Sequence, residues 1–318
     1  MRTADIVLGM LLLAGMAPVH AQTAYITDEQ ANVIHVLVAP LWKEVAAIPV
    51  GKRPRGIAPS PDGRLLYVAA SDDDRIEIVD RGKGKVVGTL PSGPDPERFA
   101  VSPDGKWLYV ANEDDALVSF VDIAARRIVR EVPVGAEPEG MAVSPDGRWV
   151  VCTSESAGLA HFIDARTGTL VDSQMVGTRP RDAKFSSDGS TLWVSSETRA
   201  SVTVFSMPDR RRLDTVDFDR DPNAPASVQA VGIALGRRAF VALGRGNAVA
   251  EVDPQSFAIL RHFPAGNRVW GIGVSPDGRY LLAAAGLSGE VTVVDLARNR
   301  VQATIHTGGK PWGVVVLP

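Results

Sequence analysis

The sequence has few of the residues that several classes of protein require. It contains one cysteine, Cys152, which excludes an intramolecular disulfide and a Cys-x-x-Cys-His haem attachment. Its 34 lysines and arginines are outnumbered by 37 aspartates and glutamates, so the formal net charge is -3 and the basic excess of a nucleic-acid-binding protein is missing. No segment after the N-terminal leader approaches the roughly 20 apolar residues of a membrane-spanning helix. We therefore expect a soluble protein with no nucleic-acid partner and no membrane span.

The N-terminal leader has the pattern of an export signal. Arg2 precedes an apolar stretch over residues 6–16, and Val19-His20-Ala21 is a small-residue cleavage pattern. The sequence thus predicts a signal peptide over residues 1–21, cut after Ala21, and a periplasmic or secreted mature protein.

Aromatic residues are scarce, at 6%, but those present mark a repeat. Aligned apolar runs begin at intervals of 42, 42, 42, 42, 47 and 42 residues, starting from Tyr25, Tyr67, Tyr109, Val151, Trp193, Phe240 and Leu282. Seven such units account for nearly all of residues 22–318, which we expect to form one domain.

Each repeat is divided by turn signals into four short apolar runs. In one unit these are residues 55–60, 65–69, 75–80 and 85–90, and the first two are separated by Ser60-Pro61-Asp62-Gly63, a turn phrase that returns in most other units. A lone four-stranded sheet leaves both faces exposed, whereas seven packed radially bury them. The repeat therefore predicts an all-β fold, a seven-bladed β-propeller with four-stranded blades.

The phase of the repeat predicts how the ring closes. The chain starts in the middle of a unit, with candidate strands at 24–27, 33–38 and 44–50, and ends on 313–317, which matches the first strand of the other units. We expect the last blade to combine three N-terminal strands with the C-terminal inner strand.

Several phrases resemble a known repeat family. Three tetrapeptides resemble the signature of YVTN-family β-propeller repeats, namely Tyr25-Ile26-Thr27-Asp28, Tyr67-Val68-Ala69-Ala70 and Tyr109-Val110-Ala111-Asn112. More narrowly, the chain resembles the exported seven-repeat propeller associated with pyrroloquinoline-quinone (PQQ)-dependent alcohol catabolism, through Gly51-Lys52-Arg53-Pro54-Arg55-Gly56, Arg268-Val269-Trp270 and Pro311-Trp312-Gly313. It departs from that pattern at Leu235-Gly236-Arg237-Arg238, which predicts a shortened hairpin in the fifth blade. The resemblance implies a periplasmic accessory protein whose partner is a quinoprotein dehydrogenase, a cytochrome or a transport binding protein. It supplies no catalytic residue and no cofactor, and we expect a monomer.

Propellers usually bind at one end of the central channel, where the connections between blades converge. In this chain those connections carry a different polar group in each unit, which could form an asymmetric recognition surface from arginine forks and tryptophan faces. The candidate residues are Arg53, Arg55, Glu97, Arg98, Glu137, Glu139, Arg179, Arg181, Asp182, Gln229, Arg268, Trp270, Lys310 and Trp312. The alternative is that they are solvated loop charges forming pairs worth about 0–1 kcal/mol.

Other polar clusters do not predict a metal site. The acidic residues at 72–74 and 113–115 suit hairpin turns and lack the spacing of a calcium loop. His35 and His161 fall in the same repeat column of different blades and cannot converge on one ion. The long connection over residues 217–231 is either a functional lip or a tolerated insertion.

Three functions remain open. The first is a non-catalytic accessory protein that binds a protein or a small acidic ligand at the channel mouth. The second is a lactonase-like hydrolase, for which Glu97, Glu139, Arg181 and Arg268 are the candidates, because a general base near an oxyanion-stabilising arginine is workable. The third is a structural or cell-surface interaction module.

Overall fold

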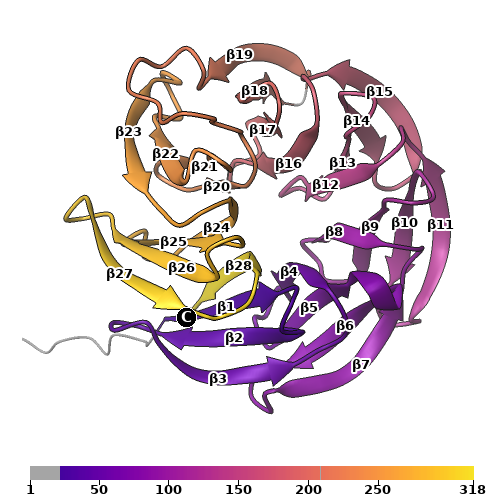
Figure 1. The fold of residues 1–318 in the computed structure, drawn as a ribbon. Coiled ribbons are helices and arrows are strands. Elements are labelled where there is room, and N and C mark those ends of the chain that lie inside the picture. Colours follow the sequence, from indigo (N-terminus) through magenta and orange to yellow (C-terminus); the bar gives the residue numbers. More distant parts are fainter. Residues whose placement is uncertain (1–21, 208) are drawn as a thin grey trace, which may run out of the picture.

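A computed structural model describes residues 22–207 and 209–318, and the signal peptide predicted for residues 1–21 lies outside the described residues. The described residues form seven four-stranded antiparallel sheets arranged as blades around a central axis (Figure 1). The predicted seven-bladed β-propeller is therefore confirmed. We number the blades from the first complete one along the chain.

The strand boundaries follow the repeat. Blade 1 consists of β4 (Pro54–Pro59), β5 (Leu65–Ala70), β6 (Arg75–Asp80) and β7 (Lys85–Pro91), with a 3₁₀ turn, η1 (Ser71–Asp73), after β5. Blade 2 consists of β8 (Pro96–Val101), β9 (Trp107–Asn112), β10 (Leu117–Asp122) and β11 (Arg127–Pro133). Blade 3 consists of β12 (Pro138–Val143), β13 (Trp149–Ser154), β14 (Leu159–Asp164) and β15 (Thr169–Met175). Blade 4 consists of β16 (Pro180–Phe185), β17 (Thr191–Ser196), β18 (Ser201–Ser206) and β19 (Arg211–Asp217).

The remaining blades include the irregular one. Blade 5 consists of β20 (Ile233–Leu235), β21 (Ala239–Ala242), β22 (Ala248–Val252) and β23 (Ile259–Pro264). Blade 6 consists of β24 (Val269–Val274), β25 (Tyr280–Ala285), β26 (Glu290–Asp295) and β27 (Arg300–His306). Blade 7 consists of β28 (Pro311–Leu317), β1 (Thr23–Asp28), β2 (Val33–Val38) and β3 (Lys43–Pro49). The first two strands of blade 5 have only 3 and 4 residues, which confirms the shortened hairpin.

Blade 7 closes the ring as the repeat phase predicts. Its strand order is β28-β1-β2-β3, and β28 pairs with β1 in the register Tyr25↔Val315 and Ile26↔Val314. In Figure 1 the yellow C-terminal strand lies beside the indigo N-terminal one. Thr27 Oγ1 accepts a hydrogen bond from Gly313 N at 2.9 Å and donates one to Arg55 O at 2.7 Å, which ties blade 7 to blade 1.

The recurrent Ser-Pro-Asp-Gly phrase forms the turn between the first and second strands. In five blades the serine hydroxyl donates to the aspartate two residues later at 2.5–2.6 Å. The glycine of each turn has a φ of 67–72°, a left-handed conformation that a residue with a side chain adopts only with strain. The turns therefore depend on both the aspartate and the glycine.

The inner strands pack so closely around the axis that one repeat column is mostly glycine. It contains Gly56, Arg98, Gly140, Asp182, Gly232, Gly271 and Gly313. A Cβ at Gly313 would lie 2.6 Å from Arg55 O of the next inner strand, and one at Gly232 would lie 2.5 Å from Trp270 O. This close approach leaves the channel narrow, and it brings residues from non-adjacent blades into contact.

Because closure depends on β28, we predict that deleting residues 313–318 destabilises the whole ring. The deletion removes the strand that pairs with β1 and the side chain of Val316, which is 7% exposed and whose burial alone contributes about 1.5–3 kcal/mol. Thermal unfolding should show a midpoint lowered by well over 10 °C or no cooperative transition. Deleting Pro318 alone is the control, since it removes one exposed hydrogen bond from Arg81. An unchanged midpoint in the longer deletion would reject this closure.

Candidate binding site at the channel mouth

One end of the channel collects the polar residues. The connections between blades and the turns between second and third strands both lie at this end. Six inner strands begin with a pair whose second residue is large and polar or aromatic, namely Arg55, Glu97, Glu139, Arg181, Trp270 and Trp312. The propeller geometry therefore places these six side chains in a single layer around the axis.

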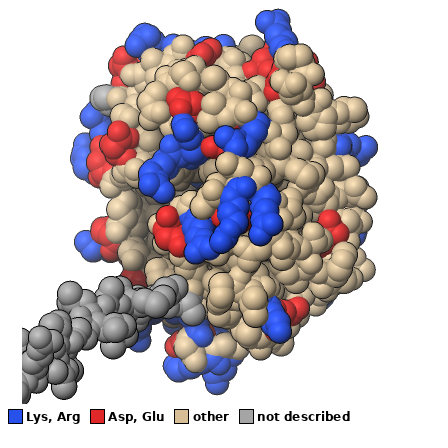
Figure 2. Space-filling model, turned by 90° about the vertical axis from the view of Figure 1, so that its left-hand side faces the viewer, with Lys and Arg blue, Asp and Glu red and all other residues tan. Residues whose placement is uncertain are grey.

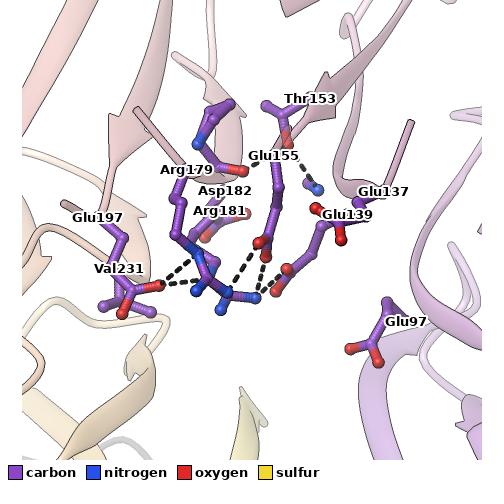
Figure 3. Close-up of polar contacts among 12 residues, drawn as sticks. Glu97, Glu137, Glu139, Thr153, Glu155, Arg179, Arg181, Asp182, Glu197 and Val231 are labelled. Atoms are coloured by element: carbon purple, nitrogen blue, oxygen red, sulfur yellow. Dashed lines mark hydrogen bonds and ion pairs between the residues drawn. The ribbon is translucent and has the colours of Figure 1, made fainter. Parts of the chain in front are cut away.

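Arg181 is the centre of the best connected part of that layer (Figure 3). Its Nε lies 2.6 Å from Glu197 Oε2, and its Nη1 pairs with both Glu139 and Glu155. Arg179 lies 2.7 Å from the second oxygen of Glu155. The Arg181 side chain is 10% exposed, and the surrounding carboxylates raise its pKa despite the opposing effect of burial. The three pairs of Arg181 are buried and so differ from solvated loop charges, whereas the Arg179 side chain is 52% exposed.

A second group of ion pairs surrounds Glu97 on the other side of the mouth. Arg55 pairs with Glu97 and lies 3.1 Å from Glu29, while Arg53 pairs with Asp95 and lies 2.6 Å from Asp72. Glu97 is fully buried, and this burial raises its pKa in spite of Arg55. Its Oε2 has no hydrogen-bond partner among the described residues.

Two tryptophans provide flat apolar surface within this charged layer. The rings of Trp270 and Trp312 stack with centroids 6.5 Å apart and an interplanar angle of 25°. The guanidinium of Arg268 lies 4.0 Å from the centroid of Trp270, and that of Arg98 lies 4.5 Å from the centroid of Trp312. Both arrangements are cation–π contacts, which hold the guanidinium planes in place.

Arg98 differs from its neighbours because it is not saturated. Its Nη1 lies 3.6 Å from Asp182 Oδ1, but its buried Nε and Nη2 have no hydrogen-bond partner among the described residues. Asp182 already accepts hydrogen bonds from Ile233 N at 2.9 Å and Ala183 N at 3.0 Å. Nε and Nη2 form one edge of the guanidinium, the edge that binds a carboxylate through two parallel hydrogen bonds. This edge of Arg98 is therefore buried and has no hydrogen-bond partner among the described residues.

By contrast, the guanidinium of Arg268 has close hydrogen-bond partners. It lies 2.7 Å from Glu197 and also donates to Gln229, a residue of the long connection over 217–231. That connection is anchored by Phe218 and Ala230, both 0% exposed. Its described contacts therefore include the core of blade 5 as well as the mouth.

The layer encloses a polar cavity of about 290 Å³. Its lining consists of Arg53, Arg55, Asp95, Glu113, Glu139, Arg179, Arg181, Trp270 and Trp312. A cavity of this size, bounded by charged groups and by the stacked tryptophans, suits a small polar ligand rather than a large apolar one.

Three carboxylates at the cavity edge could hold a cation. Oxygens of Asp95, Glu97 and Glu113 lie within 4.8 Å of one another. Arg53 and Arg55 already pair with two of these groups, so a metal would compete with two guanidinium ions. Hard cations such as Ca²⁺ would need further oxygen ligands than these three.

The structure divides the candidates predicted from sequence into two groups. Ten of them belong to the channel network described above, namely Arg55, Glu97, Arg98, Glu139, Arg181, Asp182, Gln229, Arg268, Trp270 and Trp312. The other four, Arg53, Glu137, Arg179 and Lys310, line cavities at the outer rim, although Arg53 and Arg179 also reach the inner group.

Sequence reasoning missed the glutamates of the turns between second and third strands. Four glutamates share one repeat column and interact with the mouth arginines or with Glu97, namely Glu29, Glu113, Glu155 and Glu197. Glu113 lies in the turn between β9 and β10, as the sequence predicts, and in addition burial and its proximity to Glu139 raise its pKa. The signal was present as glutamate at the same place in four repeats.

The fold and the mouth define a β-propeller with an asymmetric polar channel, and comparisons with known proteins agree. The chain belongs to the YNCE-like β-propeller family, whose sequence profile matches residues 11–318. No curated protein of significant similarity was found. Within the described residues, no helix is long and apolar enough to cross a membrane.

Solved structures share the fold at low identity. A Kuenenia stuttgartiensis hydrazine synthase chain matches with a TM-score of 0.72 and 23% identity, covering 82% of this chain and 89% of that one. A "putative 6-phosphogluconolactonase" from Bacteroides uniformis matches with a TM-score of 0.77 and 19% identity, covering 93% and 99%. A protein from Lactobacillus plantarum matches with a TM-score of 0.80 and 16% identity, covering 93% and 100%. At these identities the likeness shows the fold alone.

The raised pKa of Glu97 predicts a pH dependence that a single substitution should remove. The ordinary pKa of Glu97 is 4.5, so above this pH its carboxyl loses a proton in the unfolded chain but keeps it in the folded protein. Glu97 therefore lowers the free energy of unfolding as the pH rises toward its folded pKa. Urea unfolding of the wild type and of Glu97→Gln should therefore show the wild type losing stability relative to the variant between pH 5 and pH 8. Glu137→Gln, at the exposed rim, serves as the control. Parallel stability curves for Glu97→Gln and the wild type would contradict this assignment.

Proposed function

We propose that the protein is a non-catalytic, exported accessory β-propeller that binds a small carboxylate at its channel mouth and serves PQQ-dependent alcohol oxidation or its transport system. The observation that carries the binding proposal is the Nε/Nη2 edge of Arg98, which has no hydrogen-bond partner among the described residues, while its guanidinium lies over Trp312 and its Nη1 lies near Asp182. A buried donor without a partner costs about 1–3 kcal/mol, and a bound carboxylate would recover that cost.

The surroundings favour a carboxylate over a cation or a neutral ligand. Arg55, Arg181 and Arg268 are neutralised by carboxylates of the protein, so they shape the cavity without leaving a broad positive field. Arg98 alone offers two parallel donors, and its geometry selects planar anions. The partly exposed Trp270 provides a surface for the apolar portion of the ligand.

The context of alcohol oxidation rests on two arguments. The first is the resemblance to the propeller associated with PQQ-dependent alcohol catabolism, together with the predicted export signal. The second is chemical, because full oxidation of an alcohol yields a carboxylate. In this proposal the propeller binds that product class, or presents it to a quinoprotein dehydrogenase, its cytochrome or a transport binding protein.

Lactone hydrolysis is the second candidate function. It is favoured by Glu97 and Glu155, whose raised pKa values leave a protonated carboxyl beside Arg55 and beside Arg181. Such a pair could protonate a leaving group while the arginine stabilises an oxyanion. The fold is shared with the B. uniformis protein whose name refers to lactonase activity. Against it, Glu139 and Glu197, the remaining candidate bases, are held as ion pairs with lowered pKa values.

We predict that the mature protein binds short carboxylates through Arg98. In isothermal titration with acetate and benzoate, Arg98→Lys should weaken binding by at least about tenfold, because lysine loses the parallel hydrogen bonds. Arg166→Lys, at an exposed turn remote from the mouth, is the matched control. No binding of either carboxylate to the wild type, or equal affinity in Arg98→Lys, would overturn the proposal.

The enzymatic alternative predicts a different result. Proton release from glucono-δ-lactone and 6-phosphogluconolactone, measured at constant pH, should not exceed the spontaneous rate if the protein only binds. Accelerated hydrolysis that is lost in both Glu97→Gln and Glu155→Gln would instead establish the hydrolase, and Arg98→Lys would then be assayed for KM against kcat.

A further inference from the structure

At the end of the propeller opposite the mouth, the turns between first and second strands pack against one another. In blades 1 to 3, the proline of the turn lies against the glycine of the next turn. A Cβ at Gly105 would lie 3.2 Å from Pro61, and one at Gly189 would lie 3.4 Å from Pro145. These contacts link the turns of blades 1 to 4 in a continuous arc.

The arc is interrupted at blade 5. Its hairpin has only Gly236, Arg237 and Arg238 between the strands and closes with a Gly236 N to Arg238 O hydrogen bond of 2.9 Å. At Gly278 of blade 6, the atom nearest to an added Cβ is Arg237 Nη2, at 3.5 Å, whereas a proline is nearest at Gly105, Gly147 and Gly189. The missing turn opens a cleft of about 1080 Å³ between blades 5 and 6.

The cleft has a basic side. Arg237, Arg238 and Arg279 line it, and Figure 2 shows Lys and Arg side chains gathered on the side of the molecule that carries β23 and β27. Arg237 has no ion pair among the described residues. Arg238 pairs with Asp253 and lies 3.4 Å from Glu251.

Arg279 is also only weakly held. Its Nη2 lies 3.8 Å from Asp295 Oδ2, which is bound more closely by Arg298 at 2.6 Å. Asp277, the acid of the neighbouring turn, accepts from Ser275 at 2.6 Å and from Arg279 N at 2.9 Å. The acids beside the cleft are thus occupied, whereas Arg237 and Arg279 retain donors for a ligand.

The cleft also has an apolar side. Leu235, Val274 and Leu296 line it and are each partly exposed. Arginines facing an apolar wall suit a ligand with an anionic head and an apolar body, because the two parts gain from hydrogen bonding and from burial respectively.

We propose that this cleft is a second binding site, separate from the mouth, for amphiphilic organic anions such as alkyl carboxylates or alkyl phosphate esters. Arg237 and Arg279 bind the head group, and Leu235, Val274 and Leu296 contact the alkyl chain. The site exists because blade 5 lacks the turn that fills the corresponding space in blades 1 to 4. It does not depend on the proposed function of the mouth.

The test compares octanoate, octyl phosphate and inorganic phosphate by isothermal titration of the mature protein, repeated in an Arg98→Lys background so that the mouth does not contribute. We expect one site for at least one octyl anion, with affinity reduced at least tenfold in Arg237→Ala/Arg279→Ala and unchanged in Arg166→Ala. The two octyl probes distinguish a carboxylate from a phosphate head. Absence of binding by both, or inorganic phosphate binding as tightly as octyl phosphate, would overturn the proposal.

A second variant tests the structural cause. Replacing Gly236-Arg237-Arg238 by Ser-Pro-Asp-Gly-Arg, the turn that blade 6 carries at 275–279, should fill the cleft and abolish octyl-anion binding while the variant still melts cooperatively. Retained binding in the folded variant would show that the anions bind elsewhere. If the replacement fails to fold, the double arginine variant decides.

Discussion

The close approach of seven inner strands around one axis governs the rest of this structure. Where Gly313 meets the carbonyl of Arg55, the strands leave no space for a side chain, so the column is glycine in five blades. The side chains one position earlier must then share a narrow channel, and they come from all parts of the sequence. Arg268 reaches Glu197 across 71 positions of the chain. The tight packing that makes the ring therefore also makes the charge network.

Burying this charge network costs free energy, and that cost bears on the function of the network. Buried ion pairs seldom add much stability, because the loss of hydration offsets the attraction between the charges. A propeller retained only for its fold could fill this layer with apolar groups, as it does between blades with Phe162 and Phe205. In the mouth, by contrast, three glutamates are arranged around Arg181, while two donors of Arg98 have no partner among the described residues. This distribution of paired and unpaired groups is the basis of our proposal that the mouth binds a carboxylate.

The repeat made the fold predictable, and the same regularity concealed the partners. The number of blades, the strand positions near Tyr25 and Leu282 and the closure by β28 all follow from period and turn chemistry, which are local properties. The short hairpin at 235–238 was predicted from a departure from the pattern of the family that the chain resembles. Arg181 pairs with Glu155 of the neighbouring blade and with Glu197 of its own blade, both at other repeat positions, so these pairs depend on the radius of the ring and the direction of each side chain. An alignment of the repeats shows which residues occupy equivalent positions, but it does not show how far apart their side chains lie in the ring. The alignment therefore gave no reason to place Glu155 or Glu197 beside Arg181, and Glu113 was assigned only to its turn.

The molecule departs from a regular propeller at the positions where its repeats differ from one another. At one end, the glycine column is broken by Arg98 and Asp182, which meet across the channel. At the other, the arc of Pro-Gly contacts is broken by Arg237, which occupies the place of a proline beside Gly278. Both exceptions replace a small or rigid packing residue with a charged one, and both leave arginine donors unused. Packing alone would select against such exchanges, because a small residue fits better and costs no desolvation. In our two proposals, ligand binding at each end provides the compensating free energy that packing does not.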